Sequence, residues 1–228
     1  MTRVLVNFIG LAVTWGVWLW LAGQDFAQET SLFIAMAGVL ALIPAILFGR
    51  RLLDHQSNLQ RAELITTVMH YLFATLFGSA LLAAVQSVLK SPAWPIPLPP
   101  WLGFGLMLVS GLLLLAVTIN LVYKGLGSPL ALGLTRLVVT DWIYAWTRNP
   151  LVLSALLFLV GLGLWFQSGL FLVWVLVVVC PTILVFLKVY EERELEIRFG
   201  QAYREYRSRT PMIVPRRPPK RPLNRPND

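Results

Sequence analysis

The stretch LVLSALLFLVGLGLWFQSGLFLVWVLVVVCPTILVFLKV, residues Leu151–Val189, is apolar along most of its length. It is interrupted once, at FQSG (Phe166–Gly169), which leaves two runs that approach or reach the roughly 20 residues of a membrane-spanning helix. Backbone polar groups inside a bilayer must find partners within the chain, and a helix provides them. The stretch therefore predicts a helical hairpin in a membrane, with both of its ends on the same side.

The rest of the chain has the same character. Of its 228 residues, 57% are hydrophobic and 13% are charged, whereas roughly 25% of the residues in a soluble domain are charged. We expect an all-α fold, a polytopic membrane helical bundle of about six transmembrane helices followed by a C-terminal cytoplasmic helix. Four further apolar runs precede the hairpin: Val4–Ala22, Ser31–Gly49, Thr67–Leu89 and Trp101–Tyr123.

The net charge of +8 is explained by topology rather than by nucleic acid binding. With six spans and a cytoplasmic N-terminus, every one of the 19 Lys and Arg residues except Lys90 falls on the cytoplasmic side. The sequence predicts a multi-pass protein of a bacterial inner membrane with both termini cytoplasmic. Its expected partner is the lipid bilayer, and its oligomeric state stays open.

The single cysteine, Cys180, excludes an internal disulfide. The two histidines, His55 and His70, have no acidic or cysteine residues at ligand spacing, so we expect no metal site. We interpret His70 as a polar contact between helices.

The chain divides into three predicted regions. Residues 1–123 hold four transmembrane helices, joined on the cytoplasmic side by a short interfacial helix within Arg50–Glu63. Residues 124–209 hold an irregular loop, the hairpin and a C-terminal helix with a stripe of recurring side chains on one face, Glu192, Leu195, Phe199, Tyr203 and Tyr206. Residues 210–228 are rich in proline and basic residues and predict a disordered tail.

Polar side chains flank the hairpin at both ends. Tyr144, Arg148 and Asn149 precede it, and Glu191 and Glu192 follow it. Because both ends face the cytoplasm, these side chains are expected to be neighbours. They could form either an interfacial salt bridge or a polar pocket, and the sequence alone leaves both readings open.

The same residues carry a resemblance to a known family. TRNP, followed across the hairpin by EERELEIRFGQAYREYRSRTPMIVP, resembles the isoprenylcysteine carboxyl methyltransferase and phospholipid N-methyltransferase superfamily. Its motifs are Arg-His/Asn-Pro, Glu-Glu-x-x-Leu, Phe-Gly-x-x-Tyr-x-x-Tyr and a late proline. GLGSPLALGLTRLVVTDWIY is similar to the lead of the bacterial branch. The resemblance covers Gly125–Pro215.

The resemblance implies an S-adenosylmethionine-dependent methyltransferase with a lipid-like or small hydrophobic acceptor: an isoprenylcysteine carboxylate, a phospholipid amine or a thiol. It implies a cofactor site built from Tyr144, Arg148, Asn149, Pro150, Glu191 and Glu192. In it, Arg148 would pair with the cofactor carboxylate, and Glu192 and Glu191 would accept from its amine and hydroxyls. Asn149 stands where many members have histidine, and Pro150 suits the first position of a helix.

The sequence departs from the family at two places. Leu151–Ser154 replaces Met-Tyr-Leu-Gly, and Trp142 and Ile143 replace Gly-Pro. These departures bear on the identity of the substrate more than on the binding of the cofactor. Two other readings stay open, a membrane reductase of related architecture and a non-catalytic membrane protein or transporter. The absence of a glycine-rich dinucleotide fingerprint disfavours the first, and the scarcity of ionisable residues within the spans disfavours the second.

Overall fold

The computed structural model describes residues 2–55, 58–91, 93–125 and 138–217, and the regular structure in these ranges is helical apart from one isolated bridge between Pro95 and Ser168. The all-α prediction is confirmed. The helices before the polar loop are α1 (Thr2–Ala22), α2 (Gln28–Leu40), α3 (Leu42–His55), α4 (Leu59–Lys90) and α5 (Pro100–Gly125). Those after it are η2 (Trp142–Ala145), α6 (Pro150–Trp165), α7 (Gly169–Val173), η3 (Trp174–Val179), α8 (Cys180–Val185), η4 (Phe186–Glu191) and α9 (Glu192–Arg209).

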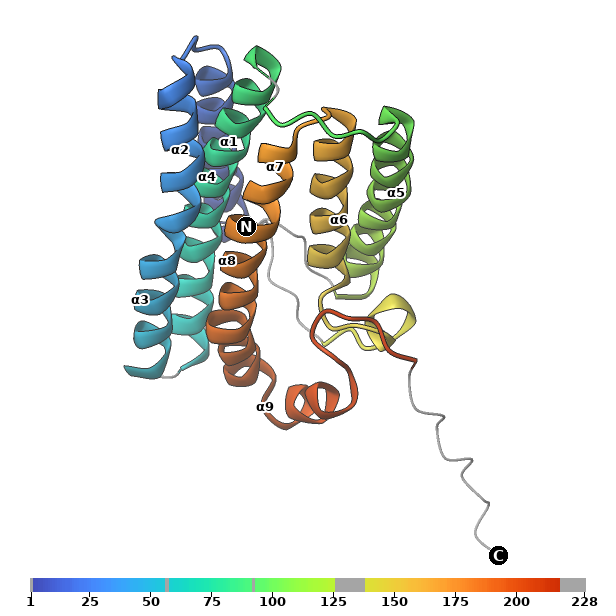
Figure 1. Cartoon of the computed structure of the whole chain (residues 1–228). Coiled ribbons are helices and arrows are strands. Elements are labelled where there is room, and N and C mark those ends of the chain that lie inside the picture. Colours follow the sequence, from blue (N-terminus) through green and yellow to red (C-terminus); the bar gives the residue numbers. More distant parts are fainter. Residues whose placement is uncertain (1, 56–57, 92, 126–137, 218–228) are drawn as a thin grey trace, which may run out of the picture.

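These helices run side by side as a bundle, with α9 outside it (Figure 1). α2 and α3 make a single pass that bends at Ala41, close to Pro44, whose ring cannot donate to the preceding turn. Four passes contain a helix long and apolar enough to cross a membrane, namely Gln28–His55, Leu59–Lys90, Pro100–Leu121 and Gly169–Arg209. The other two apolar helices, Phe8–Ala22 and Pro150–Trp165, are shorter, so the predicted count of six spans is not confirmed by this measure.

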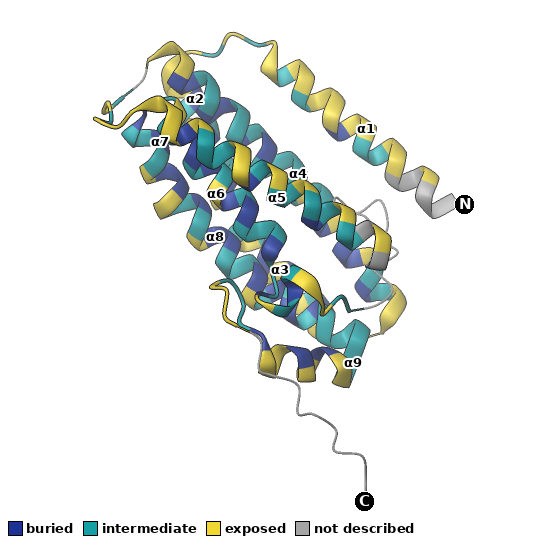
Figure 2. Ribbon diagram, turned by 90° about the vertical axis from the view of Figure 1, so that its right-hand side faces the viewer, coloured by how far each residue is buried: buried dark blue, intermediate teal, exposed yellow. Residues whose placement is uncertain are grey.

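The outer faces of the bundle are exposed and apolar, as expected for helices surrounded by lipid (Figure 2). The buried faces pack around α4, α7, η3 and α8, where one core cluster joins residues such as Val39, Ala80 and Val175. On the other side, α5 packs along α6. A Cβ on Gly103 would lie 2.3 Å from the backbone nitrogen of Trp165, so glycine is required for this close approach of two helix backbones.

The last pass contains two π-helical segments, η3 and η4. η3 ends just before Pro181, whose missing N–H leaves one carbonyl of the preceding turn without its usual donor. η4 leads directly into α9. Such widened turns are frequent at functional sites.

α9 leaves the bundle and lies beneath it (Figure 1). Gly200 interrupts it with φ of 53°, a left-handed conformation that glycine adopts without a steric penalty. The expectation of a C-terminal helix after the hairpin is confirmed, and Gly200 is where its backbone departs from helical geometry.

The cytoplasmic connection between α3 and α4 differs from the prediction. The expected short interfacial helix in Arg50–Glu63 was wrong, because α3 continues to His55 and α4 begins at Leu59. Asn58 caps α4 by accepting from the backbone N–H of Arg61 at 2.8 Å. The two spanning helices are therefore simply longer than their apolar cores.

Candidate functional site

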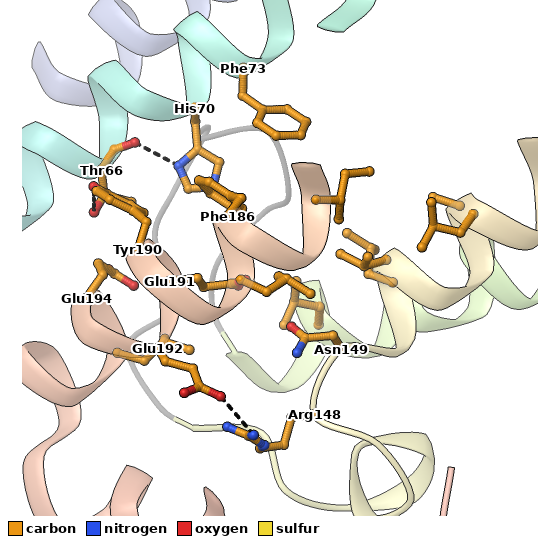
Figure 3. Close-up of a pocket in the computed structure, with 18 of the residues that line it drawn as sticks. Thr66, His70, Phe73, Arg148, Asn149, Phe186, Tyr190, Glu191, Glu192 and Glu194 are labelled. Carbon is orange, nitrogen blue, oxygen red and sulfur yellow. Dashed lines mark hydrogen bonds and ion pairs between the residues drawn. The ribbon is translucent and has the colours of Figure 1, made fainter. Parts of the chain in front are cut away.

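A cavity of about 510 Å³ lies between α4, α6, the end of the last pass and α9 (Figure 3). One end is polar and is built by the residues before α6 and after α8. The other end is apolar and extends to α1 and the middle of α4. Its polar wall includes Thr66, His70, Tyr144, Arg148, Asn149, Tyr190, Glu191, Glu192, Glu194, Arg198, Tyr203 and Tyr206. Its apolar wall includes Trp18, Phe73, Phe77, Gly78, Leu81, Leu121, Val152 and Leu159.

Arg148 and Glu192 form a buried ion pair at the polar end. The Arg148 Nη2 atom lies 2.9 Å from Glu192 Oε1, and the two side chains are 8% and 7% exposed. The predicted proximity of the two hairpin ends is thus observed, and the pair is not a solvent-exposed surface bridge. Arg148 Nη1 also donates to the Tyr203 hydroxyl at 3.0 Å.

Glu192 is approached by two further cations. Its Oε2 atom lies 3.3 Å from Lys188 Nζ and 3.6 Å from Arg207 Nε, both of which reach toward solvent. Three cations therefore contact this carboxylate, one of which, Arg207, also pairs with Glu196. The buried Nε–H of Arg148 has no hydrogen-bond partner among the described residues, although such groups are nearly always paired.

Glu191, the next carboxylate, lines the cavity and is half-buried. Within the described part of the chain, its carboxylate has no hydrogen bond or ion pair. Figure 3 shows its side chain directed away from Glu194 and toward the α6 side of the cavity. A buried carboxylate without a partner is costly, so this position favours a ligand that carries donors or positive charge.

The aromatic stripe of α9 packs against the segment before α6, as expected. Tyr203 and Tyr206 are buried, and the Tyr206 hydroxyl donates to the Tyr144 carbonyl at 2.7 Å. Tyr144 itself is buried in η2. Burial, together with the negative charge of Glu191, raises the pKa of the Tyr144 hydroxyl far above its ordinary value, so it stays protonated.

Asn149 and Pro150 lie at the start of α6. Asn149 Nδ2 donates one hydrogen bond to the Met212 carbonyl at 3.0 Å, and the residue also lines the cavity. Pro150 is the first residue of α6 and is fully buried, but it lies outside the main cavity wall. It fixes where the helix begins and thereby where Arg148 is presented.

The first part of the predicted tail is structured around these residues. The Pro211 carbonyl accepts from the Arg148 backbone N–H at 2.9 Å, and the Met212 carbonyl also accepts from the Thr147 hydroxyl at 3.1 Å. Further along, the Arg216 N–H donates to the Trp146 carbonyl at 3.0 Å. Residues 210–217 thus form a strap across the start of α6, which differs from the expected disordered tail.

Two other predicted segments lie outside the described residues. These are the glycine-rich lead in residues 126–137 and the end of the tail, residues 218–228. The division of the chain into three regions stays a prediction.

A second polar cluster, which sequence reasoning missed, lies where α4 meets η4 and α9. The Thr66 and Tyr190 hydroxyls are 3.0 Å apart, and Glu194 pairs with Arg198 at 2.7 Å with both side chains buried. His70 Nδ1 lies 2.7 Å from the Thr66 carbonyl oxygen. Thr66, Thr67 and His70 lie close together in the sequence of α4, but the helix also holds Thr75, Ser79 and Gln86, so the sequence alone does not mark the cluster.

The fold and this cavity define a class of protein: a helical membrane protein with a ligand-sized cavity whose polar end lies at the foot of the bundle. The comparison with protein families then gives a specific result. The model of the phospholipid methyltransferase family matches residues 98–202, which runs from the start of α5 into α9 and includes Arg148, Glu191 and Glu192. Over these residues the chain is similar to a membrane methyltransferase domain, as its motifs indicated.

No curated protein and no solved structure matches the chain significantly.

Proposed function

We propose that the protein is an integral membrane methyltransferase that uses S-adenosylmethionine and acts on a lipid-like or small hydrophobic acceptor. The observation that carries this proposal is the buried Nε–H of Arg148, which has no hydrogen-bond partner among the described residues and lies at the polar end of the cavity, within the region that matches the family. Glu191 lines the same cavity.

The cofactor and these residues are chemically complementary. S-adenosylmethionine carries a carboxylate, an ammonium group and ribose hydroxyls. Arg148 retains a free donor for the carboxylate, and its fork is held in place by Glu192 and Tyr203. Glu191 offers a free acceptor for the ammonium or hydroxyl groups. Glu192 adds negative charge beside it, and Tyr144 lines the same wall.

The bound cofactor supplies an activated methyl group, and the protein supplies the geometry. Arg148 and Glu191 orient one reactant at the polar end, while the apolar wall positions the other and excludes water. Asn149 and Pro150 keep Arg148 in position through the strap and the start of α6.

The shape of the cavity supports a lipid-like acceptor. Its apolar wall along α4 runs from Phe73 to Leu81, which suits a hydrocarbon chain with its head group at the polar end. The distribution of basic residues along the chain supports a cytoplasmic position for this polar end and for both termini, in a bacterial cell.

Binding of S-adenosylmethionine to purified protein in detergent, measured by calorimetry, tests the proposal. Arg148→Lys should bind almost as poorly as Arg148→Ala, because lysine keeps the charge but loses the planar fork. A lost charge-assisted hydrogen bond costs about 1.5–3 kcal/mol, so affinity should fall roughly tenfold to a hundredfold. Glu191→Gln and Glu192→Gln should also weaken binding.

Arg204→Gln is the matched control, because Arg204 is exposed on α9 and its Nε contacts only the side chain of Gln201. It should leave affinity unchanged. Wild-type protein that does not bind S-adenosylmethionine would contradict the proposed function.

A further inference from the structure

His70 is presented to the cavity in a defined protonation form. Its Nδ1 atom lies 2.7 Å from the Thr66 carbonyl oxygen, which can only accept a hydrogen bond, so Nδ1 carries the proton. In the neutral ring, Nε2 then has a free lone pair. Among the described residues, nothing donates to this nitrogen.

The position of His70 is at the boundary between the two halves of the cavity. The α4 residues that line the cavity run from Thr66 to Leu81, a distance of roughly 22 Å along the helix axis at 1.5 Å per residue. His70 is one turn from the polar end of this path. Figure 3 shows its ring between Thr66 and the aromatic rings of Phe73 and Phe186, whose centroids are 5.1 Å apart.

An acceptor whose chain lies along the apolar wall would place its first polar atom beside this ring. Glu191 is not a competing base in this arrangement, because the proposed function assigns its carboxylate to the cofactor. The Tyr190 hydroxyl is already engaged with Thr66 at 3.0 Å. His70 Nε2 is therefore the acceptor that remains for a proton released in the apolar half of the cavity.

We infer that His70 is a catalytic base and that the methyl acceptor carries a proton on the atom that is methylated, as an amine or a thiol does. The inference rests on the proposed function and narrows its substrate class, because a carboxylate acceptor is already ionised and needs no base. In the step, the acceptor atom forms a bond to the methyl carbon and its proton passes to His70 Nε2. The carbon–sulfur bond of the methyl donor breaks, and its electron pair stays on sulfur.

The ionisable groups near His70 come from three elements. Glu194 and Arg198 on α9 form a buried pair at 2.7 Å. Glu191 on η4, and Arg148 before α6 with its partner Glu192, lie on the same cavity wall. Because the two arginines are paired with carboxylates, the neutral ring with its free Nε2 lone pair is the form presented to an acceptor.

The test compares three amphiphiles with the same alkyl chain: dodecanethiol, dodecylamine and dodecanoate. The variant His70→Asn keeps a side-chain N–H for the Thr66 carbonyl but cannot take up a proton. His55→Gln is the matched control, because His55 is exposed at the end of α3 and is the only other histidine. Methyl transfer from radiolabelled S-adenosylmethionine is followed as a function of pH.

We expect wild-type protein and His55→Gln to methylate the thiol or the amine in preference to dodecanoate. His70→Asn should lower that rate at neutral pH by about 10²–10⁴-fold, the usual contribution of a general base, while cofactor affinity is unchanged. Transfer to the thiol should recover at alkaline pH, where the thiol ionises without help. Preferred methylation of dodecanoate, or an unchanged rate in His70→Asn, would overturn the inference.

Nitrogen NMR of histidine-labelled protein gives a readout that does not depend on turnover. With only two histidines, the His55→Gln spectrum assigns both rings. We expect an unprotonated Nε2 on His70 that shifts when dodecanethiol or dodecylamine is added. A ring protonated at Nε2, or one that neither amphiphile perturbs, would overturn the inference even if no transfer is detected. Loss of cofactor binding in wild-type protein would instead contradict the proposed function.

Discussion

Replacing Glu192 with glutamine should destabilise the protein more than replacing Arg148 with glutamine, although the two residues form one ion pair. Glu192 is the shared partner of three cations, Arg148 at 2.9 Å, Lys188 at 3.3 Å and Arg207 at 3.6 Å. Arg148 is held by Glu192 and by the neutral hydroxyl of Tyr203. The two substitutions therefore leave different charges behind.

The expected loss in the free energy of unfolding depends on which charge each substitution leaves buried. Removing one partner of a buried ion pair costs about 3–5 kcal/mol, because the other charge stays buried without compensation. Glu192→Gln leaves the Arg148 guanidinium in this state, with an 8% exposed side chain. After Arg148→Gln, Glu192 keeps Lys188 and Arg207, whose side chains are 60% and 39% exposed. These exposed partners recover part of the loss, which leaves a cost of about 1–3 kcal/mol.

Denaturant unfolding in detergent micelles, followed by tryptophan fluorescence, measures both variants. Lys188→Gln is the control and should cost less than about 1 kcal/mol, because its contact with Glu192 is largely exposed. An Arg148→Gln variant that is as unstable as Glu192→Gln, or less stable, would refute the idea that the outer cations compensate.

Three further predictions concern the strap, the packing of α1 and the response to alkali. Ending the chain after Arg217 should change the free energy of unfolding by less than about 0.5 kcal/mol in a denaturant titration. Ending it after Arg209 removes the hydrogen bonds of the strap and should cost several times more in the same assay. Gly78→Ala would place a Cβ 1.8 Å from an indole ring of α1 and should cost about 1–3 kcal/mol, whereas Gly105→Ala meets nothing within 4 Å and should be neutral or slightly stabilising in the same assay. Because the pKa of Tyr144 is raised in the folded state, the contribution of this residue to stability should be constant below about pH 10 and fall above it, where only the unfolded chain loses this proton. Tyr144→Phe should make that fall in the pH-dependent unfolding midpoint shallower.

Much of the fold could be predicted from hydropathy alone. The bounds of α5 and α6 differ from the predicted runs by at most two residues at each end, since the apolar composition changes sharply there. The meeting of Arg148 and Glu192 was also predictable, because a hairpin returns the chain to the side from which it started. Neither inference needed knowledge of how the helices pack.

The second polar cluster could not be predicted, because it depends on the rotation of α4 relative to α9. α4 is apolar on nearly every face, so its sequence does not indicate which side meets Glu194. The strap was missed for a related reason. Its contacts use backbone carbonyls, such as that of Met212, which leave no signature in side-chain composition.

Trp142 adopts a backbone conformation that usually favours glycine, the residue that the family carries at this position. Trp142 has φ of 53°, the left-handed region that glycine occupies without strain. Its ring is half exposed, so the chain accommodates the strain without burying the side chain.

The π-helical turn η4 also constrains how the protein can change over evolutionary time. Tyr190, Glu191 and Glu192 are consecutive, yet all three line the cavity. A regular α-helix spreads three consecutive side chains over about 200° of its circumference, because each residue turns by about 100°. A one-residue deletion within Phe186–Glu191 would let the helix become regular and would rotate at least one of these side chains out of the cavity. Related chains should therefore vary freely in the apolar residues of this segment but keep its length, with insertions and deletions confined to the loops.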